Sequence, residues 1–325
     1  MSQELQVLAI SAIITAGIQL SGFAVAFALK TETFYDILGG INFLTIAIYS
    51  AIDGQNDDIS FFDSPRKASF TILFLISRFW LLLFLAWRAH ERKGDSRFDE
   101  IKYNFASFLI AWMFQGVWVF TISLPVIFVN GSDNIQNDGL TVLEYVTIVG
   151  FGLGVFIEII ADIQKAAWVK NGRVGTFCTA GVWKYSRHPN YFGEIFQWWC
   201  AWIFAYGSST GPGDVQWWCS VLSPVMTMLI LLFTPATGVM NANGSNLKRY
   251  YDKCPVEYAK YRKETSILIP LPCGLYKFVP MFLKRTLFFD LKKYEYSGEI
   301  SNVPASENNE NGENNDVSND RTSLK

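Results

Sequence analysis

The sequence has little charge for its length, since only 17% of its 325 residues are Asp, Glu, Lys or Arg, against about 25% in an average soluble domain. The net charge is −2, which gives no support to nucleic-acid binding. The five cysteines are scattered singly without a CxxC pair, which argues against a disulfide framework or a zinc site. The first residues lack the basic region and the cleavage site of a secretory signal.

The sequence is instead rich in long apolar runs. Hydrophobic residues make up 50% of the chain, and a membrane-spanning helix needs about 20 of them in succession. Seven windows are candidates, of which the second and the sixth are the shortest: residues 5–29, 37–52, 68–87, 103–129, 140–161, 195–206 and 215–234. These runs are too long for barrel strands. We therefore expect an all-α polytopic membrane bundle of about seven transmembrane helices.

Lys and Arg alternate between the predicted loops. They are frequent in residues 88–102, 162–191 and 248–293, and absent from residues 130–139 and 207–214. Basic loops face the cytosol, so the C-terminus is predicted to be cytosolic.

The chain is predicted to divide into a membrane domain, residues 1–293, and a disordered tail, residues 294–325. The tail is rich in Asn and acidic residues and poor in large apolar ones, so it cannot bury enough surface to fold. Just before the tail, Pro270, Pro272 and Pro280 interrupt an apolar segment. We expect this segment to lie in the membrane interface rather than to span the bilayer.

The stretch GVWKYSRHPNYFGEIFQWW, residues 181–199, places polar chemistry directly before an apolar run. A juxtamembrane loop would account for its basic residues and tryptophans. It would not account for His188, Asn190 and Glu194 standing together. A helix beginning near Tyr191 would place Asn190 close to a cap position, and its N-terminal amides would attract an anion. The stretch therefore favours an anionic cofactor, such as one with a pyrophosphate.

Two acidic residues and one arginine lie inside predicted spans. Glu158 and Asp162 are four residues apart and share a helix face. Intramembrane carboxylates are functional candidates, although Asp162 could also be solvated or paired with Lys165. Arg78 would cost about 2.5–3.5 kcal/mol at the centre of a span. It should pair with an acid, for which Asp36 or Glu144 is available, or contact a bound anion.

Two further patterns have two interpretations each, and a third is a glycosylation sequon. Tyr258, Tyr261 and Arg262 recur at helical spacing, as expected either for a basic helix on an anionic leaflet or for a lid over a nucleotide. The GxGxG pattern at residues 150–154 lies in an apolar helix, which favours close helix packing over a phosphate loop. Asn130 begins a glycosylation sequon close to the membrane.

Residues 187–194 resemble the signature of the membrane-embedded reductase superfamily that includes steroid 5-alpha-reductases and sterol reductases. The stretches AWRAHERKGDSRF, EIIADIQKAAWVKN, SPVMTMLILLFT and EYAKYRKETSILIP are also similar, in the same order. The resemblance covers about residues 70–275. It implies an endoplasmic-reticulum membrane protein that binds NADPH from the cytosolic side and reduces a carbon–carbon double bond of a steroid, sterol or other lipid.

The resemblance also implies site residues. Cofactor contacts would come from Arg97, Asp162, Lys165, Tyr185, Arg187, His188, Asn190, Tyr191, Tyr258, Tyr261 and Arg262, with Glu158 and Glu194 as candidate catalytic residues. In the steroid enzymes a Glu and Tyr pair on an earlier span supplies the proton, and no such pair is evident before residue 100. The proton donor therefore stays unassigned at this point.

Two other functions remain open. Membrane methyltransferases of the isoprenylcysteine or phospholipid type also carry an Arg-His-Pro-x-Tyr element, here residues 187–191, and bind S-adenosylmethionine near the cytosolic face. A non-catalytic lipid-binding or scaffold protein could also retain the fold.

Overall fold

The computed structural model describes residues 2–54, 61–92, 95–132, 139–173, 177–235 and 237–296. In these ranges the chain is helical and forms no strand, apart from one isolated β-bridge between Ser186 and Ser266. Six described stretches are long and apolar enough to cross a membrane: α1 (Gln3–Leu29), α2 (Tyr35–Asp53), most of α3 (Pro65–Arg92), α4 (Phe105–Gly131), α5 (Val142–Lys170) and a stretch within Val215–Lys253. The expected helical membrane protein is thereby supported.

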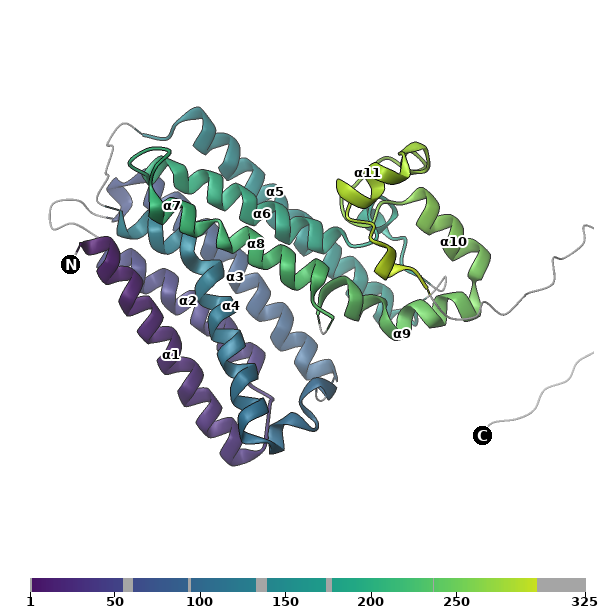
Figure 1. Cartoon of the computed structure of the whole chain (residues 1–325), viewed down its shortest axis with the longest axis horizontal. Coiled ribbons are helices and arrows are strands. Elements are labelled where there is room, and N and C mark those ends of the chain that lie inside the picture. The colour runs from purple at the N-terminus through teal and green to yellow at the C-terminus, as the bar shows by residue number, and fades with distance from the viewer. Residues whose placement is uncertain are drawn as a thin grey trace, which may run out of the picture.

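A seventh span stays a prediction. The helix in question, α6 (Pro189–Ala205), has 17 residues, which is at the short limit for crossing a bilayer. It is followed by α7 (Val215–Ser220), α8 (Leu222–Met228) and a π-helical turn, Leu229–Phe233. The long helices of the bundle lie beside one another and run alternately in opposite directions (Figure 1).

Local sequence signals explain where three of the helices begin. The Asn104 side chain accepts a hydrogen bond from the Ser107 amide at 3.0 Å and caps α4. Thr141 and Glu144 form a reciprocal capping box at the start of α5. Pro189 is the first helical residue of α6, a position where its missing N–H costs nothing.

Glycines bring α5 and α6 into backbone contact. A Cβ atom on Gly193 of α6 would lie 2.5 Å from the carbonyl oxygen of Gly154 on α5, and one on Gly154 would lie 2.8 Å from the Gly193 oxygen. Gly150 fits equally closely against Cys200, whereas Gly152 has open space around it. The close-packing interpretation of the GxGxG pattern therefore holds for Gly150 and Gly154 but not for Gly152.

Replacing Gly193 with alanine is expected to lower the free energy of unfolding by about 1–3 kcal/mol, the usual cost of overpacking. The two nearest atoms belong to the backbone of Gly154 and Glu158, so they cannot move aside as a flexible side chain could. The measurement is unfolding of the purified protein in detergent micelles. Gly152→Ala is the matched control and should be neutral or slightly stabilising. Equal stability of the two variants would contradict the backbone contact.

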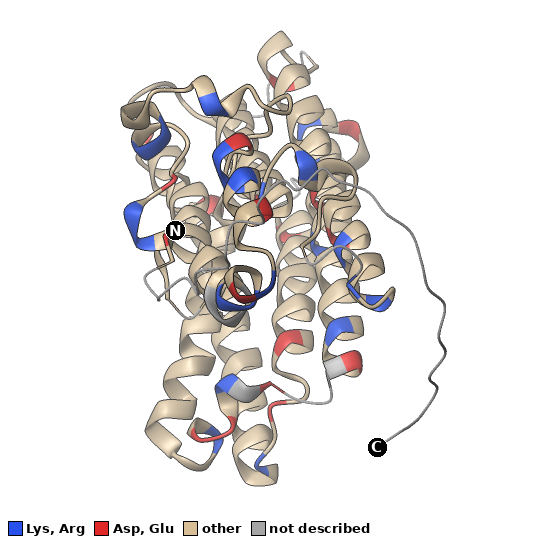
Figure 2. Cartoon of the chain, turned by 90° about the vertical axis from the view of Figure 1, so that its right-hand side faces the viewer, with Lys and Arg blue, Asp and Glu red and all other residues tan. Residues whose placement is uncertain are grey.

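The C-terminal part forms a separate group of short helices at one end of the bundle (Figure 1). It contains α9 (Gly238–Lys253), α10 (Pro255–Glu264) and α11 (Met281–Thr286). Figure 2, viewed from this end, shows Lys and Arg residues interspersed with Asp and Glu residues. The proline-rich segment before α11 contains only the short turn Tyr276–Phe278 in its described part, as its prolines predict.

The first residues of the predicted tail are packed. Tyr294 is buried and donates its hydroxyl to the Leu232 carbonyl, and the Tyr296 ring stacks on Tyr251 at 4.7 Å. Residues 297–325, on which the disorder prediction rests, lie outside the described residues.

The sequon residue Asn130 is fully buried in α4. Its Oδ1 accepts a hydrogen bond from Thr71 at 3.0 Å, and its Nδ2 donates to Ser50 at 2.9 Å. Because N-glycosylation is a bulky surface modification, the folded chain does not present this sequon to a transferase.

Candidate functional site

A buried charged cluster lies between α3 and α6. The Arg78 side chain is completely buried, and its guanidinium lies 3.1 Å from Glu194 Oε1. It also donates to Ser77 Oγ at 2.8 Å and lies over the Trp198 ring at 4.7 Å. These contacts replace part of the water that an intramembrane arginine loses, while Arg78 Nη1 has no hydrogen-bond partner among the described residues.

The expected pairing of Arg78 with Asp36 or Glu144 is wrong. Asp36 lies 3.8 Å from Arg88, and Glu144 is paired with Arg66. Arg66 and Arg88 stand near the two ends of α3, twelve and ten residues from Arg78. At 1.5 Å per residue the two acids are therefore displaced from Arg78 by roughly 15–18 Å along the helix axis.

Two carboxyl groups meet in this cluster. The Gln197 amide nitrogen lies 2.7 Å from Glu158 Oε2 and 3.3 Å from Glu194 Oε2, while its Oε1 accepts from Ser77 at 2.7 Å. Arg78 is the only guanidinium seen to pair with them in the described part of the chain. Two buried carboxylates beside one cation hold a shared proton more readily than two negative charges. Gln197 was missed by the sequence analysis, although it follows Glu194 by one helical turn.

A second polar group forms the mouth of the site, at the start of α6. Asn190 Nδ2 donates to Asp162 Oδ1 at 3.2 Å, so Asp162 pairs with the amide rather than with Lys165. Asn190 Oδ1 is buried and has no hydrogen-bond partner among the described residues. The His188 and Tyr191 rings stack in parallel, with centroids 5.2 Å apart. Asn190 is the second residue of α6, and His188 takes the cap position.

Burial lowers the pKa of His188 to about 3, and the charges of Arg187 and Lys165 act in the same direction, whereas a hydrogen bond from the imidazole to Asn243 acts against them. The imidazole is therefore neutral in the folded protein while it titrates near 6.5 in the unfolded chain. The free energy of unfolding that comes from burying the neutral imidazole is fully present above pH 6.5 and is lost as the pH falls toward 3.

Acidification from pH 7 to pH 5 is therefore expected to cost about 2 kcal/mol through His188 alone. The measurement compares the stability of the wild type and of His188→Gln at both pH values. The variant should lose less stability on acidification. His90, exposed at the end of α3, supplies the control variant His90→Gln. An equal loss of stability between pH 7 and pH 5 in all three proteins would contradict the burial of a neutral imidazole.

Lys165 lies between two tryptophans. Its ammonium is 4.6 Å from the Trp168 ring and 4.5 Å from the Trp183 ring. The charges of Arg173 and Arg249 act on it electrostatically, and no acid in the described ranges lies within ion-pair distance of it. Lys165, Arg173 and Arg249 therefore place positive charge beside the mouth.

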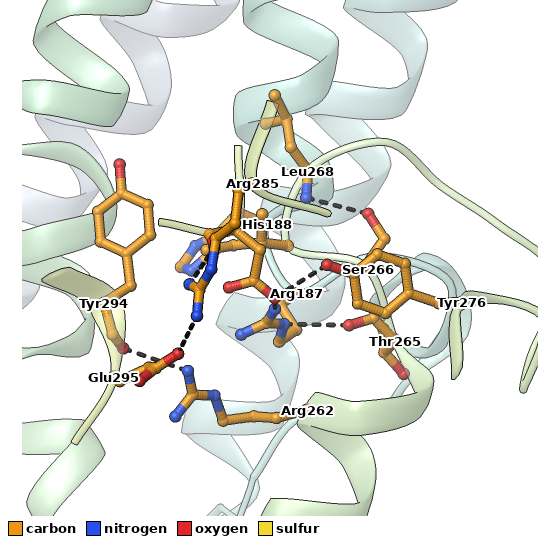
Figure 3. Close-up of polar contacts among 12 residues, drawn as sticks. Arg187, His188, Arg262, Thr265, Ser266, Leu268, Tyr276, Arg285, Tyr294 and Glu295 are labelled. Atoms are coloured by element: carbon orange, nitrogen blue, oxygen red, sulfur yellow. Dashed lines mark hydrogen bonds and ion pairs between the residues drawn. The ribbon is translucent and has the colours of Figure 1, made fainter. Parts of the chain in front are cut away.

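Arg187 connects α6 to the C-terminal segment (Figure 3). Its side chain donates to the Thr265 carbonyl at 3.1 Å and to Asp290 at 2.5 Å, and its amide donates to the Ser266 carbonyl at 2.8 Å. Tyr276 also donates to Asp290, at 2.9 Å. Arg187, which is predicted to contact a cofactor, therefore links the start of α6 to the C-terminal segment.

The predicted residues of α10 are also engaged in packing. The Tyr261 hydroxyl donates to the Trp183 carbonyl at 2.5 Å. Tyr258 is buried among aromatic rings, and burial raises its pKa to about 12. Arg262 donates to the Tyr251 hydroxyl at 3.1 Å and to the Tyr294 carbonyl at 3.3 Å.

Among the described residues, the side chains of Arg97 and Tyr185 make no hydrogen bond or ion pair with the residues at the mouth. Arg97 pairs with Asp95 in the loop before α4, where Phe98 packs on Tyr35 with ring centroids 4.8 Å apart. Tyr185 is 38% exposed, and its carbonyl accepts from the Leu271 amide at 3.0 Å. The structure thus brings together Glu158, Asp162, His188, Asn190, Tyr191 and Glu194, with Lys165 beside them.

Comparison with known proteins gives one match. No curated protein and no solved structure matches the chain. A family model described as "Protein of unknown function (DUF1295)" matches residues 22–265, about three quarters of the 325 residues. This range contains the charged cluster and the mouth. The chain therefore belongs to the DUF1295 family of proteins of unknown function.

Proposed function

We propose that this protein is an integral-membrane reductase of the endoplasmic reticulum that uses NADPH to reduce a carbon–carbon double bond of a steroid, sterol or other lipid. The observation that carries the proposal is the arrangement along α6. Asn190 faces Asp162 at the mouth, and Glu194 and Gln197, one and two turns deeper, face Glu158 and Arg78. The resemblance of residues 187–194 to the reductase signature agrees with this arrangement.

The residues at the mouth suit a dinucleotide. The unpartnered Oδ1 of Asn190 requires an N–H donor, such as a carboxamide. Lys165, with Arg173 and Arg249 near it, offers positive charge for phosphates. The N-terminus of α6 adds backbone amides. When bound there, NADPH would supply a hydride.

The charged cluster would supply the proton. Reduction of a conjugated double bond requires a proton on the carbon next to the one that receives hydride. Arg78 holds Glu194 as the carboxylate, so we assign the shared proton to the Glu158 carboxyl. Gln197, hydrogen-bonded to both acids, would keep them aligned as the proton leaves, and the positive charge of Arg78 would stabilise the resulting carboxylate.

The test is a thermal-shift measurement on detergent-purified full-length protein with NADPH, NADH and S-adenosylmethionine. A ligand that binds only the folded state raises stability by about 2.7 kcal/mol at one hundred times its Kd. Stabilisation by NADPH, followed by NADPH oxidation with lipid enones, is the expected result. Stabilisation by S-adenosylmethionine alone would favour a methyltransferase. No shift with any ligand would favour a non-catalytic lipid-binding protein.

Asn190→Ala is expected to weaken NADPH binding roughly tenfold, because it removes one buried hydrogen bond. The Kd can be read from the dependence of the thermal shift on NADPH concentration. Asn243→Ala is the control for general loosening of the mouth, since Asn243 contacts His188 and lies on α9. An unchanged Kd in Asn190→Ala would remove the amide from the cofactor site.

A further inference from the structure

The segment around α11 exposes large apolar side chains. Phe278, Met281, Phe282 and Leu287 are 74, 61, 72 and 56% exposed. Lys277, Lys284 and Arg285 stand among them in the sequence. Aromatic and aliphatic residues interleaved with basic ones are typical of a segment that lies in a membrane interface.

Contacts with the bundle place this segment beside the membrane helices. Phe289 and Leu291 pack with Ile195 of α6 and Leu232 of the last span, and the Lys293 ammonium lies 4.6 Å from the Phe233 ring. Ile195 is six residues into α6, about 9 Å from its start. The segment therefore lies at the level of the first turns of α6.

A cavity of about 380 Å³ opens next to α11. Its walls include Arg262, Lys263, Lys284 and Arg285, with Met281 at one side. The two acids in its walls already have partners, because Asp290 contacts Arg187 and Glu295 contacts Arg285.

Lys263 and Lys284 have no acid within ion-pair distance in the described part of the chain. Burial lowers the pKa of Lys284, and the charges of Arg187 and Lys263 act in the same direction, whereas Asp290 raises it. The cavity walls thus carry four basic side chains against two acids that are already paired, at the edge of an apolar surface.

We propose that this cavity binds the headgroup of an anionic phospholipid from the membrane in which the chain is embedded. Lys263 and Lys284 would contact the phosphate, and Phe278, Met281 and Phe282 would lie against the acyl chains. Met281 belongs both to the cavity wall and to the exposed apolar surface, so one lipid molecule can reach both. This site is separate from the α5–α6 cluster and does not depend on the proposed reductase activity.

The experiment measures binding of phosphatidylserine and phosphatidylcholine to the full-length protein in neutral detergent, by native mass spectrometry. We expect phosphatidylserine to be retained in preference to phosphatidylcholine. In Lys263→Gln/Lys284→Gln its affinity should fall about thirtyfold, the combined effect of two lysines at an anionic lipid. The control is Lys253→Gln/Lys260→Gln, which removes the same charge from exposed positions of α9 and α10 outside the cavity.

A second variant, Phe278→Ser/Phe282→Ser, changes only exposed side chains and should also weaken phosphatidylserine retention. Equal binding of the two lipids by the wild type would overturn the proposal. So would an equal loss in both lysine variants, which would indicate general electrostatic attraction. Binding of inorganic phosphate as tight as that of phosphatidylserine, with no effect of the phenylalanine changes, would replace the lipid with a soluble anion.

Discussion

Arg78→Met should destabilise the bundle by about 3–5 kcal/mol, the usual cost of removing one partner from a buried ion pair. Arg78 is completely buried, and its guanidinium contacts Glu194 and Ser77. Without it, two carboxyl groups remain in the membrane interior with no compensating cation. The measurement is the free energy of unfolding in mixed micelles.

Two further variants separate the charge effect from packing. Arg88→Met removes a half-exposed partner of Asp36 at 3.8 Å and should cost less than about 1 kcal/mol. Combining Arg78→Met with Glu194→Gln should recover part of the lost stability, because the unpaired charge is removed as well. If the double variant were no more stable than Arg78→Met, the electrostatic explanation would fail.

Glu158→Gln is expected to lower kcat by about 10²–10⁴, the range for loss of a general acid. This expectation rests on the proposed reductase activity. Glutamine keeps the shape of the side chain and can still bond to Gln197, which contacts Glu158 at 2.7 Å, but it cannot release the proton. The NADPH-dependent thermal shift should therefore persist while turnover of a lipid enone is lost.

The pair of readouts distinguishes three outcomes. Lost turnover with a retained NADPH shift supports Glu158 as the proton donor. Unchanged turnover would exclude Glu158 as the proton donor and leave Glu194 as the candidate. Loss of the NADPH shift itself would mean that Glu158 supports binding or folding rather than proton transfer.

Most of the helical architecture could be predicted from the sequence, because its signals are local. Apolar runs with few charges predicted α1 to α5, and the prolines at residues 270–280 predicted an irregular segment before α11. The polar stretch before α6 predicted a concentration of polar groups at the start of this helix, where His188 and Asn190 stand. Each of these features depends on residues within a few turns of one another.

The pairing of buried charges could not be predicted, because it depends on how far each group lies along its helix. Arg78, Arg66 and Arg88 share α3, yet each finds a different acid, on α6, α5 and α2. The Gly154–Gly193 contact brings α5 against α6 and so sets Glu158 beside Gln197 and Glu194.

The contacts of Arg187 and Tyr261 were likewise not predictable from the sequence. Both residues are predicted to contact a cofactor, and both also bond to distant carbonyl groups, Arg187 to Thr265 and Tyr261 to Trp183. The sequence by itself determined which segments are helical, which are apolar enough for a membrane, and where the polar groups concentrate, since hydrophobicity and capping act locally. Tertiary structure alone decided which buried polar group satisfies which, because that depends on contacts between residues far apart in the chain.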